Sequence, residues 1–404
     1  MRVLQINAVY GHGSTGSMVK ELHEYLKQNN IESYVACSQG CSDLEPHEFV
    51  IGTVNDVKFH SVMARLSGLQ GYYSNKATEK LLRFMDKIKP DIVHLGNLHS
   101  NYLNVIKLLN YLGDRNIATV ITLHDCWFYT GKCTHYTKAG CYKWKASCGN
   151  CPQLKKDIPT WFFDKTNKML MDKASCYKKM KRLAVIGVSK WITNEVYSSI
   201  LQNANITETI YNWVDLDVFR PKKMEADQMR RKLGLQGKFT ILGVSSMWSD
   251  LKGLSTFYKL SGLLNDDEII ILVGRLNEEK MPSNIIHIPE TQSVDELGTY
   301  YSMADVFLQM SPEESFGKVV VEALACGTPV ISIDSTANAE LIGKGTGFVS
   351  HNANVDDIYH YINIIRKIGS YKYAAACRDY AEKNFMITKQ LSKYLDIYYS
   401  LLNS

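Results

Sequence analysis

Two glutamates eight residues apart lie in the stretch of this sequence best suited to chemistry. It reads Glu314-Ser-Phe-Gly-Lys-Val-Val-Val-Glu322 and continues to Gly327-Thr-Pro329. The pattern predicts a helix from near Phe316 to Gly327, because glycine tolerates a left-handed helix end and Pro329 blocks continuation. Unpaired N–H groups and the helix dipole make such an N-terminus favourable for a diphosphate. Carboxylates repel phosphate, so we expect the two glutamates to accept hydrogen bonds from sugar hydroxyls.

Short apolar strands alternate with helices in two successive halves of the chain. Strands are expected at residues 3–7, 33–37, 92–95, 119–123 and 183–188, and again at 239–244, 269–273, 285–288, 306–310 and 330–333. This alternation predicts two parallel sheets covered on both faces by helices. The boundary is expected at residues 212–221, before a charged helix at 222–232. A final helix is expected at about 388–402.

A glycine loop follows the first expected strand. Gly11, Gly13 and Gly16 have the spacing of the dinucleotide fingerprint, which opens a dehydrogenase interpretation. That interpretation needs an acidic residue at the end of the second strand, where this chain has Cys37-Ser-Gln39. The loop can instead bring its backbone close to donor phosphates or to an acceptor, because glycine removes the side-chain obstruction. A tight turn without a binding role is the other alternative.

Composition limits the class of protein. The chain has 404 residues, enough for two domains, and a hydrophobic content of 45% that supports full cores. The net charge of +5 is mild and gives no reason to expect a nucleic-acid partner. No apolar run approaches the roughly 20 residues needed to span a bilayer, and the N-terminal residues lack the features of a signal peptide. We therefore expect a cytoplasmic protein.

The two glutamates and their surroundings resemble the Glu-x7-Glu signature of glycosyltransferase family 4, the retaining nucleotide-sugar transferases of the GT-B fold. The likeness runs from Leu297 to Ile331, and residues 211–221 resemble the interdomain segment of the family, with Trp213 in place of its usual glycine. The resemblance implies an α/β fold of two Rossmann-like domains whose parallel sheets face each other across a central cleft. Residues 1–210 would form the acceptor-side domain, with a Cys-rich insert at 126–151. Residues 211–386 would bind the donor, and residues 387–404 would cross back to the first domain.

The same resemblance assigns roles to single residues. His124 follows a strand and would contact the donor sugar, and Lys252 would reach the leaving diphosphate. Where the family usually has an arginine this chain has Ser246, so Lys252 acts with the helix dipole alone, or Arg275 or Lys318 supplies a second charge. The implied catalytic residues are His124, Lys252 and Glu314. The implied donor-binding residues are Gly16, Ser246, Arg275, Ser315, Phe316, Gly317, Lys318, Val319 and Glu322.

The function implied is a retaining hexosyltransferase that needs no cofactor for catalysis. It would move a sugar from a UDP- or GDP-sugar to a glycan or lipid-linked glycan, in the branch that builds bacterial capsule, exopolysaccharide or O-antigen. The alternatives are a nucleotide-sugar epimerase or a phosphorylase of the same fold, or a non-catalytic protein that binds sugar nucleotides or glycans. A phosphorylase would need a lysine-bound pyridoxal phosphate.

Ten cysteines are many for a cytosolic enzyme. Cys133, Cys141, Cys148 and Cys151 could close a tetrahedral structural zinc site, although only the last two have the tight Cys-x2-Cys spacing. Buried free thiols are the equal alternative, and a cytosolic location disfavours disulfides.

The segment at residues 155–182 is both basic and aromatic. It carries nine Lys or Arg side chains and the run Trp161-Phe162-Phe163. Such a composition is typical of peripheral contact with an anionic membrane surface, which would be the inner face of the plasma membrane. An ordinary solvated helix face is the alternative.

Overall fold

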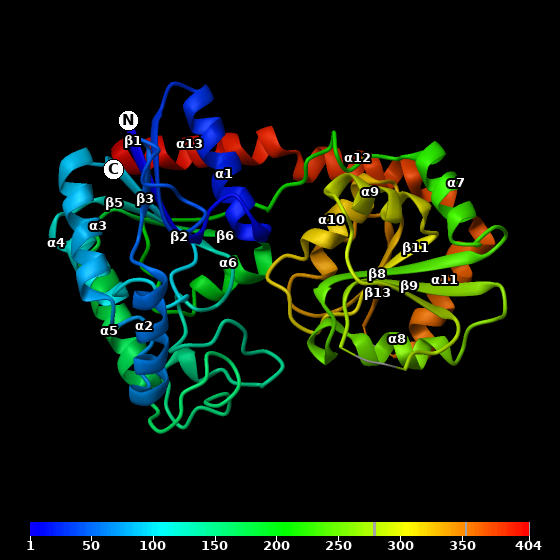
Figure 1. Cartoon of the computed structure of the whole chain (residues 1–404), viewed down its shortest axis with the longest axis horizontal. Helices are drawn as coiled ribbons and strands as arrows, with labels where there is room; N and C mark the ends of the chain where they lie inside the picture. Colours follow the sequence, from blue (N-terminus) through cyan, green and yellow to red (C-terminus); the bar gives the residue numbers. More distant parts are fainter. Residues whose placement is uncertain (278–279, 352–353, 404) are drawn as a thin grey trace. The chain divides into compact units, whose positions relative to one another are not determined.

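The computed structural model describes residues 1–277, 280–351 and 354–403. The chain divides into two compact units, each built on its own sheet (Figure 1). Unit 1 contains Met1–Ile210 together with the chain from Leu391 onward, and unit 2 contains Tyr211–Gln390. Each unit is an α/β layer structure, as the alternation of strands and helices predicts.

Unit 1 is built on a seven-stranded sheet in the order β3-β2-β1-β4-β5-β6-β7, with parallel pairing throughout. Its inner strands are buried on both faces, which explains their continuous apolar sequences. The strands are β1 (Arg2–Val9), β2 (Glu32–Gln39), β3 (Glu48–Val50), β4 (Ile92–Leu95), β5 (Ala118–Leu123), β6 (Leu183–Gly187) and β7 (Ile206–Thr209). The helices are α1 (Gly13–Gln28), α2 (Val54–Ser67), α3 (Asn75–Ile88), α4 (Val105–Asp114), α5 (Thr166–Lys179), α6 (Lys190–Val196) and the 3-10 turn η1 (Lys143–Lys145).

Unit 2 is built on a six-stranded parallel sheet in the order β10-β9-β8-β11-β12-β13. The strands are β8 (Phe239–Met247), β9 (Glu268–Arg275), β10 (Ile285–Ile288), β11 (Val306–Gln309), β12 (Val330–Ile333) and β13 (Gly347–Ser350). The helices are α7 (Lys223–Lys232), α8 (Leu254–Ser261), α9 (Val294–Met303), α10 (Lys318–Ala325), α11 (Val355–Ile368) and α12 (Ala374–Phe385). Three 3-10 turns complete the unit, namely η2 (Asp250–Lys252), η3 (Ala339–Leu341) and η4 (Ser370–Tyr373).

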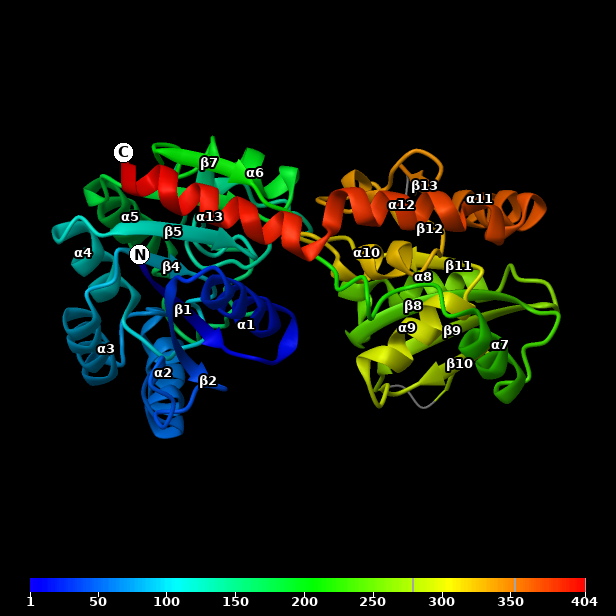
Figure 2. The ribbon, with the colours of Figure 1, turned by 90° about the horizontal axis from the view of Figure 1, so that it is seen from above.

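The last helix, α13 (Ile387–Asn403), is held on the sheet of unit 1 by a buried polar chain. The imidazole of His94 in β4 lies 2.7 Å from both Tyr398 Oη and Thr122 Oγ1, and Thr122 Oγ1 lies 3.2 Å from Tyr394 Oη. Figure 2 shows α13 running along unit 1, beside β4 and β5. Its position in β4 allows His94 either to line a cleft or to have a structural role, and these contacts give it a structural role.

Most expected strands appear with boundaries shifted by one to three residues. The short strands β3, β7 and β13 were not predicted, because each has only three or four residues and half-buried side chains. In the part of the chain that the structure describes, no helix has the length and apolar character needed to cross a bilayer.

Candidate active site

The central element of the candidate site is the N-terminus of α10 in unit 2. Gly317 precedes the helix with φ of 85° and ψ of 60°, a left-handed conformation that favours glycine. Helix α10 therefore begins at Lys318 rather than near Phe316 as expected, because the turn at Gly317 separates the loop from the helix. The helix still presents its first N–H groups to the loop, which keeps an anion site possible there.

Lys252 and Glu314 meet beside this helix. Lys252 ends the turn η2 in the loop after β8, and Glu314 lies in the loop after β11; Lys252 Nζ lies 2.5 Å from Glu314 Oε1. Gly253, with φ of 76°, lets the two loops approach, since a Cβ there would lie 2.5 Å from the carbonyl oxygen of Met310. The backbone N–H of Glu314 donates to Thr336 Oγ1 at 2.8 Å. The tertiary fold thus joins two predicted catalytic residues in one ion pair.

Glu322 is buried one helical turn after Lys318. Tyr301 Oη donates a hydrogen bond to Glu322 Oε2 at 3.0 Å. Burial raises the pKa of Glu322 to about 7, with Lys318 acting in the opposite direction. A carboxyl group with its pKa close to neutrality, held by a tyrosine, is suited to hydroxyl ligands rather than to a phosphate.

Buried polar atoms without a hydrogen-bond partner surround Gly317. A Cβ on Gly317 would lie 3.5 Å from Gln309 Nε2 and 3.6 Å from Asn338 Oδ1, and neither of these atoms has a partner within the described protein. Ser315 Oγ is likewise buried and unpartnered. Because native proteins rarely leave buried polar groups unpaired, these atoms are candidates to bind a ligand. The sequence did not single out Gln309 and Asn338, whose significance depends on the folding of three separate loops around Gly317.

Arg275 lies next to Ser246, the position where the family usually has an arginine. Arg275 ends β9, and its Nε donates to the backbone oxygen of Ser246 in β8 at 3.4 Å. Both residues are exposed. The neighbouring strand therefore brings a guanidinium group to the place that Ser246 leaves without a charge. Lys318 stands at the first position of α10, Val319 follows it half-buried, and Phe316 is buried against Tyr211 and Phe385.

In unit 1, His124 and Asp125 follow β5 at the carboxyl end of the sheet. Burial lowers the pKa of His124 to about 4, with Asp125 acting in the opposite direction, so the imidazole is neutral at pH 7. Asp125 Oδ2 lies 2.8 Å from Nε2 of His99, and Asp125 Oδ1 accepts from the N–H of Trp127 at 2.8 Å. Burial by itself would lower the pKa of His99. The charge of Asp125 and its hydrogen bond outweigh burial, so the pKa of His99 is raised. Sequence patterns do not predict this pair, because the two residues come from different loops.

Packing explains Gly16 of the glycine loop at residues 11–16. A Cβ on Gly16 would lie 3.1 Å from the Val9 side chain and 3.2 Å from the Val9 carbonyl oxygen, so Gly16 lets α1 pack tightly on β1. The N–H of Gly11 closes the turn on the carbonyl of Gly16 at 2.9 Å. The role of Gly16 at the donor stays a prediction.

The four cysteines of the predicted zinc site line one small pocket. Within the described ranges, no group of three or more His, Cys, Asp or Glu side chains is placed to hold a metal. A hydrogen bond with the Cys133 thiol lowers the pKa of Cys151 to about 6, and Gln153 Nε2 donates to Cys133 Sγ at 3.5 Å. Cys133 and Cys151 thus have hydrogen-bond partners inside the protein, and the zinc site stays a prediction.

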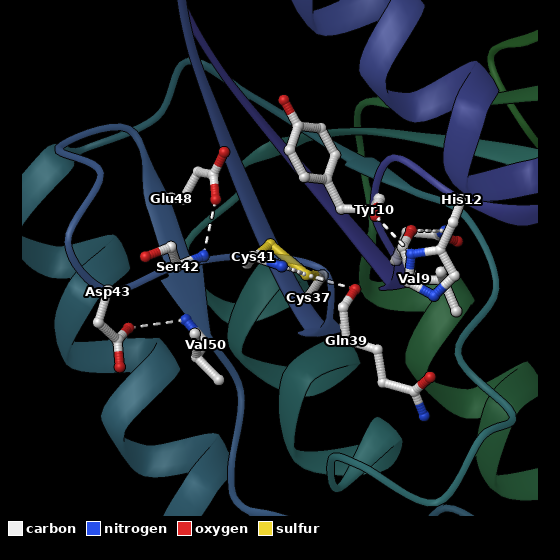
Figure 3. The surroundings of a disulfide bond; sticks show 11 residues. Val9, Tyr10, His12, Cys37, Gln39, Cys41, Ser42, Asp43, Glu48 and Val50 are labelled. Carbon is white, nitrogen blue, oxygen red and sulfur yellow. Dashed lines mark hydrogen bonds between the residues drawn. A yellow bond between two sulfur atoms is a disulfide. The ribbon is translucent and has the colours of Figure 1, made fainter.

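A disulfide joins Cys37 and Cys41 (Figure 3), and the expectation that disulfides are absent is wrong at this position. Strand β2 ends at Gln39, and Gly40, with φ of 93°, reverses the chain so that Cys41 returns to Cys37. The other eight cysteines, all in the described part of the chain, form no disulfide.

Two lysines of the insert and the following helix are buried. Lys173 Nζ donates to the carbonyl oxygens of Trp127 and Thr130 at 2.6 and 2.7 Å, so α5 is not the uniformly solvated basic face considered from the sequence. Lys132 Nζ donates to four carbonyls of residues 153–158. Both ammonium groups organise the loops that follow β5.

Two parallel-sheet units, with a helix N-terminus beside paired glutamates in the second, are the architecture of glycosyltransferases of the GT-B class. Comparison with models of known protein families identifies the family within that class. Residues 15–218 match the family described as Glycosyltransferase Family 4, and residues 226–384 match Glycosyl transferases group 1. The chain belongs to glycosyltransferase family 4 and is a hexosyltransferase-type enzyme.

Curated relatives match this chain over much of its length but at low sequence identity. WcaC of Escherichia coli (strain K12), named as a colanic acid biosynthesis glycosyl transferase, is 23% identical over 360 residues, which cover 86% of each chain. Spore coat protein SA of Bacillus subtilis (strain 168) is 24% identical over 289 residues, covering 61% of this chain and 74% of that protein.

Solved structures share the fold over the whole chain. Sucrose-phosphate synthase from Thermosynechococcus elongatus superposes with a TM-score of 0.72 at 15% identity, covering 100% of this chain and 99% of that one. HepE of Anabaena, in its complex with UDP-glucose, gives a TM-score of 0.63 at 16% identity, covering 98% and 99%. At these identities the likeness shows the GT-B fold alone.

Proposed function

We propose that this enzyme is a retaining glycosyltransferase of bacterial surface-polysaccharide synthesis. It transfers a sugar from a nucleoside-diphosphate donor to a glycan or lipid-linked glycan. The observation that carries this proposal is the grouping of Lys252, Glu314 and buried Glu322 around the N-terminus of α10. The relatives support it, since WcaC is named for colanic acid biosynthesis and HepE binds UDP-glucose.

The donor's diphosphate is proposed to lie at the start of α10. Lys252, the first N–H groups of the helix and the dipole stabilise the negative charge that develops as the nucleotide leaves. Arg275 supplies the second cation in place of the family's arginine, because its guanidinium group adjoins Ser246. No metal or cofactor takes part in this proposal.

The two glutamates are proposed to divide the donor's hydroxyl groups. Glu314 accepts from the transferred sugar, and its ion pair with Lys252 places sugar and diphosphate side by side. Glu322 accepts from the ribose, which stabilises its ionised form. Gln309, Ser315 and Asn338 offer unpartnered polar atoms to the same ligand.

The transfer proceeds on one face of the sugar. The bond between the anomeric carbon and the diphosphate oxygen breaks, and the acceptor oxygen bonds to the same face of that carbon. The departing phosphate oxygen takes the proton of the acceptor hydroxyl. A contact of neutral His124 with the donor sugar stays a prediction.

The test combines donor binding with product stereochemistry. UDP-, GDP-, ADP- and TDP-sugars are screened by thermal shift; a bound donor at one hundred times its Kd stabilises the protein by about 2.7 kcal/mol. Proton NMR of the first product then reports its anomeric configuration. An inverted product overturns the retaining mechanism. Interconversion of the donor sugar without transfer would indicate an epimerase, and sugar transfer to or from inorganic phosphate would indicate a phosphorylase.

A further inference from the structure

An exposed aromatic cluster on unit 1 has no role in the candidate site. Trp161, Phe162 and Phe163 lie in the loop before α5 and are 45%, 67% and 55% exposed. Neighbouring rings contact edge to face, with centroids 6.4 Å apart in both pairs. Single exposed apolar residues are common on proteins, but three consecutive aromatic rings form a continuous apolar patch.

A hydrogen bond fixes the backbone of this cluster against α2. The N–H of Trp161 donates to the carbonyl of Arg65 at 2.7 Å, and Thr160 Oγ1 donates to the carbonyl of Phe163 at 3.1 Å. Helix α2 adds exposed Phe59 and Val62, which lie one turn apart on its surface. The apolar side chains are thus presented to solvent on an anchored backbone rather than on a free loop.

Basic residues outnumber acidic ones in the two segments that carry the exposed apolar side chains. Residues 54–67 and 155–165 contain Lys58, Arg65, Lys155, Lys156 and Lys165. Their three acids are engaged in hydrogen bonds: Asp56 in the cap of α2, Asp157 with Thr134, and Asp164 with Cys151 and Thr166. In the described chain the exposed Lys155, Lys156 and Lys165 form no ion pair. Lys155 Nζ donates to the carbonyl of Trp161, and Lys165 Nζ lies 5.8 Å from the centroid of the Phe163 ring. We name these five basic residues, with Phe59, Val62 and residues 161–163, the aromatic–lysine surface.

We propose that the aromatic–lysine surface docks the protein on an anionic lipid bilayer. Tryptophan and phenylalanine partition into the headgroup boundary, and flexible lysines keep their ammonium groups at the lipid phosphates. Lysine is depleted at protein–protein interfaces, so the combination favours a lipid surface over a protein partner. This inference rests on the proposed function in one respect, because a lipid-linked acceptor would be met at such a surface.

The experiment measures co-sedimentation of the full chain with vesicles. Vesicles of phosphatidylcholine alone are compared with vesicles containing about 30% phosphatidylglycerol, at low and high salt. We expect binding to the anionic vesicles at least about tenfold tighter than to the neutral ones, and weaker binding at high salt, because each lysine near the surface adds to the attraction. Equal binding to the two compositions, or binding to neither, would overturn the proposal.

Two variants locate the contact, and a third serves as the matched control. Trp161→Ser/Phe162→Ser/Phe163→Ser and Lys155→Gln/Lys156→Gln/Lys165→Gln should each reduce anionic-vesicle binding by about tenfold or more. The control Met224→Ser/Val294→Ser/Tyr371→Ser removes three exposed apolar side chains of unit 2 and should bind as the unaltered protein does. A loss as large in the control would overturn the assignment of the surface.

A milder variant keeps the test valid if the serine substitutions unfold unit 1. Brominated lipids quench tryptophan that enters the bilayer, so Trp161→Phe should remove the quenching while binding persists. Quenching that remains unchanged would exclude insertion of Trp161. Failure of the docking and failure of the proposed function are distinguishable: transfer to a water-soluble acceptor without vesicle binding refutes the docking alone, and vesicle binding without any transfer refutes the proposed function alone.

Discussion

Lys252 Nζ lies 2.5 Å from Glu314 Oε1, although 62 residues separate the two in the chain. The Lys252 side chain is 38% exposed and that of Glu314 19%, so the pair is open to a ligand. An ion pair of this exposure contributes only about 0–1 kcal/mol to stability. Its position beside the N-terminus of α10 indicates a role in donor binding and turnover rather than in folding.

Lys252→Ala should therefore lower kcat/KM by about 10²- to 10³-fold while leaving the melting temperature nearly unchanged, because a fixed cation is lost where the diphosphate charge develops. Lys259→Ala, which removes an exposed lysine of the neighbouring helix α8, is the control. The double variant Lys252→Ala/Glu314→Ala should lose less than the sum of the single losses, since the two side chains act as one unit. Strict additivity would contradict a functional pair.

Nucleotide binding should release protons near pH 6.5. The pKa of Glu322 is raised to about 7 in the free protein, and ribose hydroxyls bind its ionised form, so affinity rises as the pH increases from about 5 toward 7. Calorimetric titrations with UDP in buffers of different ionisation enthalpy measure the protons released. Glu322→Gln separates this contribution from titration of the nucleotide phosphate. If the wild type and the variant release the same number of protons, the coupling to Glu322 is wrong.

Unit 1 should lose stability in mild acid. Burial lowers the pKa values of His23 and His60 to about 4 and of His94 to about 3, from an ordinary value of 6.5. The folded state therefore holds these rings neutral; their stabilisation is complete above pH 6.5 and is lost as the pH falls from 6.5 toward 4. Urea unfolding at pH 7.5 and 5.0 should show a clear decrease. His94→Gln should be less stable at pH 7.5 but should depend less on pH, and an unchanged pH dependence would contradict the assignment.

Turnover should survive EDTA. The proposed site neutralises the diphosphate with Lys252, Arg275 and the helix N-terminus, so no metal ion is required. If the buried-thiol alternative holds, the cysteine pocket should contain no stoichiometric zinc, since no group of three or more His, Cys, Asp or Glu side chains among the described residues is placed to hold a metal. Initial rates with and without chelator, together with elemental analysis of protein purified without added metal, check both statements. Loss of activity in EDTA that added magnesium or manganese restores would contradict the metal-free mechanism.

Local patterns were enough to predict the class of this fold. Apolar strands between amphipathic helices repeat in both halves, and a parallel sheet follows wherever such strands are buried on both faces. Gly317, Gly327 and Pro329 likewise marked the ends of α10 to within two residues, since the conformations that glycine and proline allow are properties of single positions.

The contacts between distant segments could not be predicted in this way. Three pairs, Lys252 with Glu314, Arg275 with Ser246 and His99 with Asp125, each join neighbouring strands or the loops that follow them. The order of those strands is set by the packing of the whole sheet. The zinc site stays a prediction for the same reason, because cysteine spacing fixes only which thiols are near in sequence. The sequence by itself thus determined the elements and the residue types at their ends. Only the tertiary structure decided which of those side chains meet, because long-range contacts depend on the packing of the complete fold.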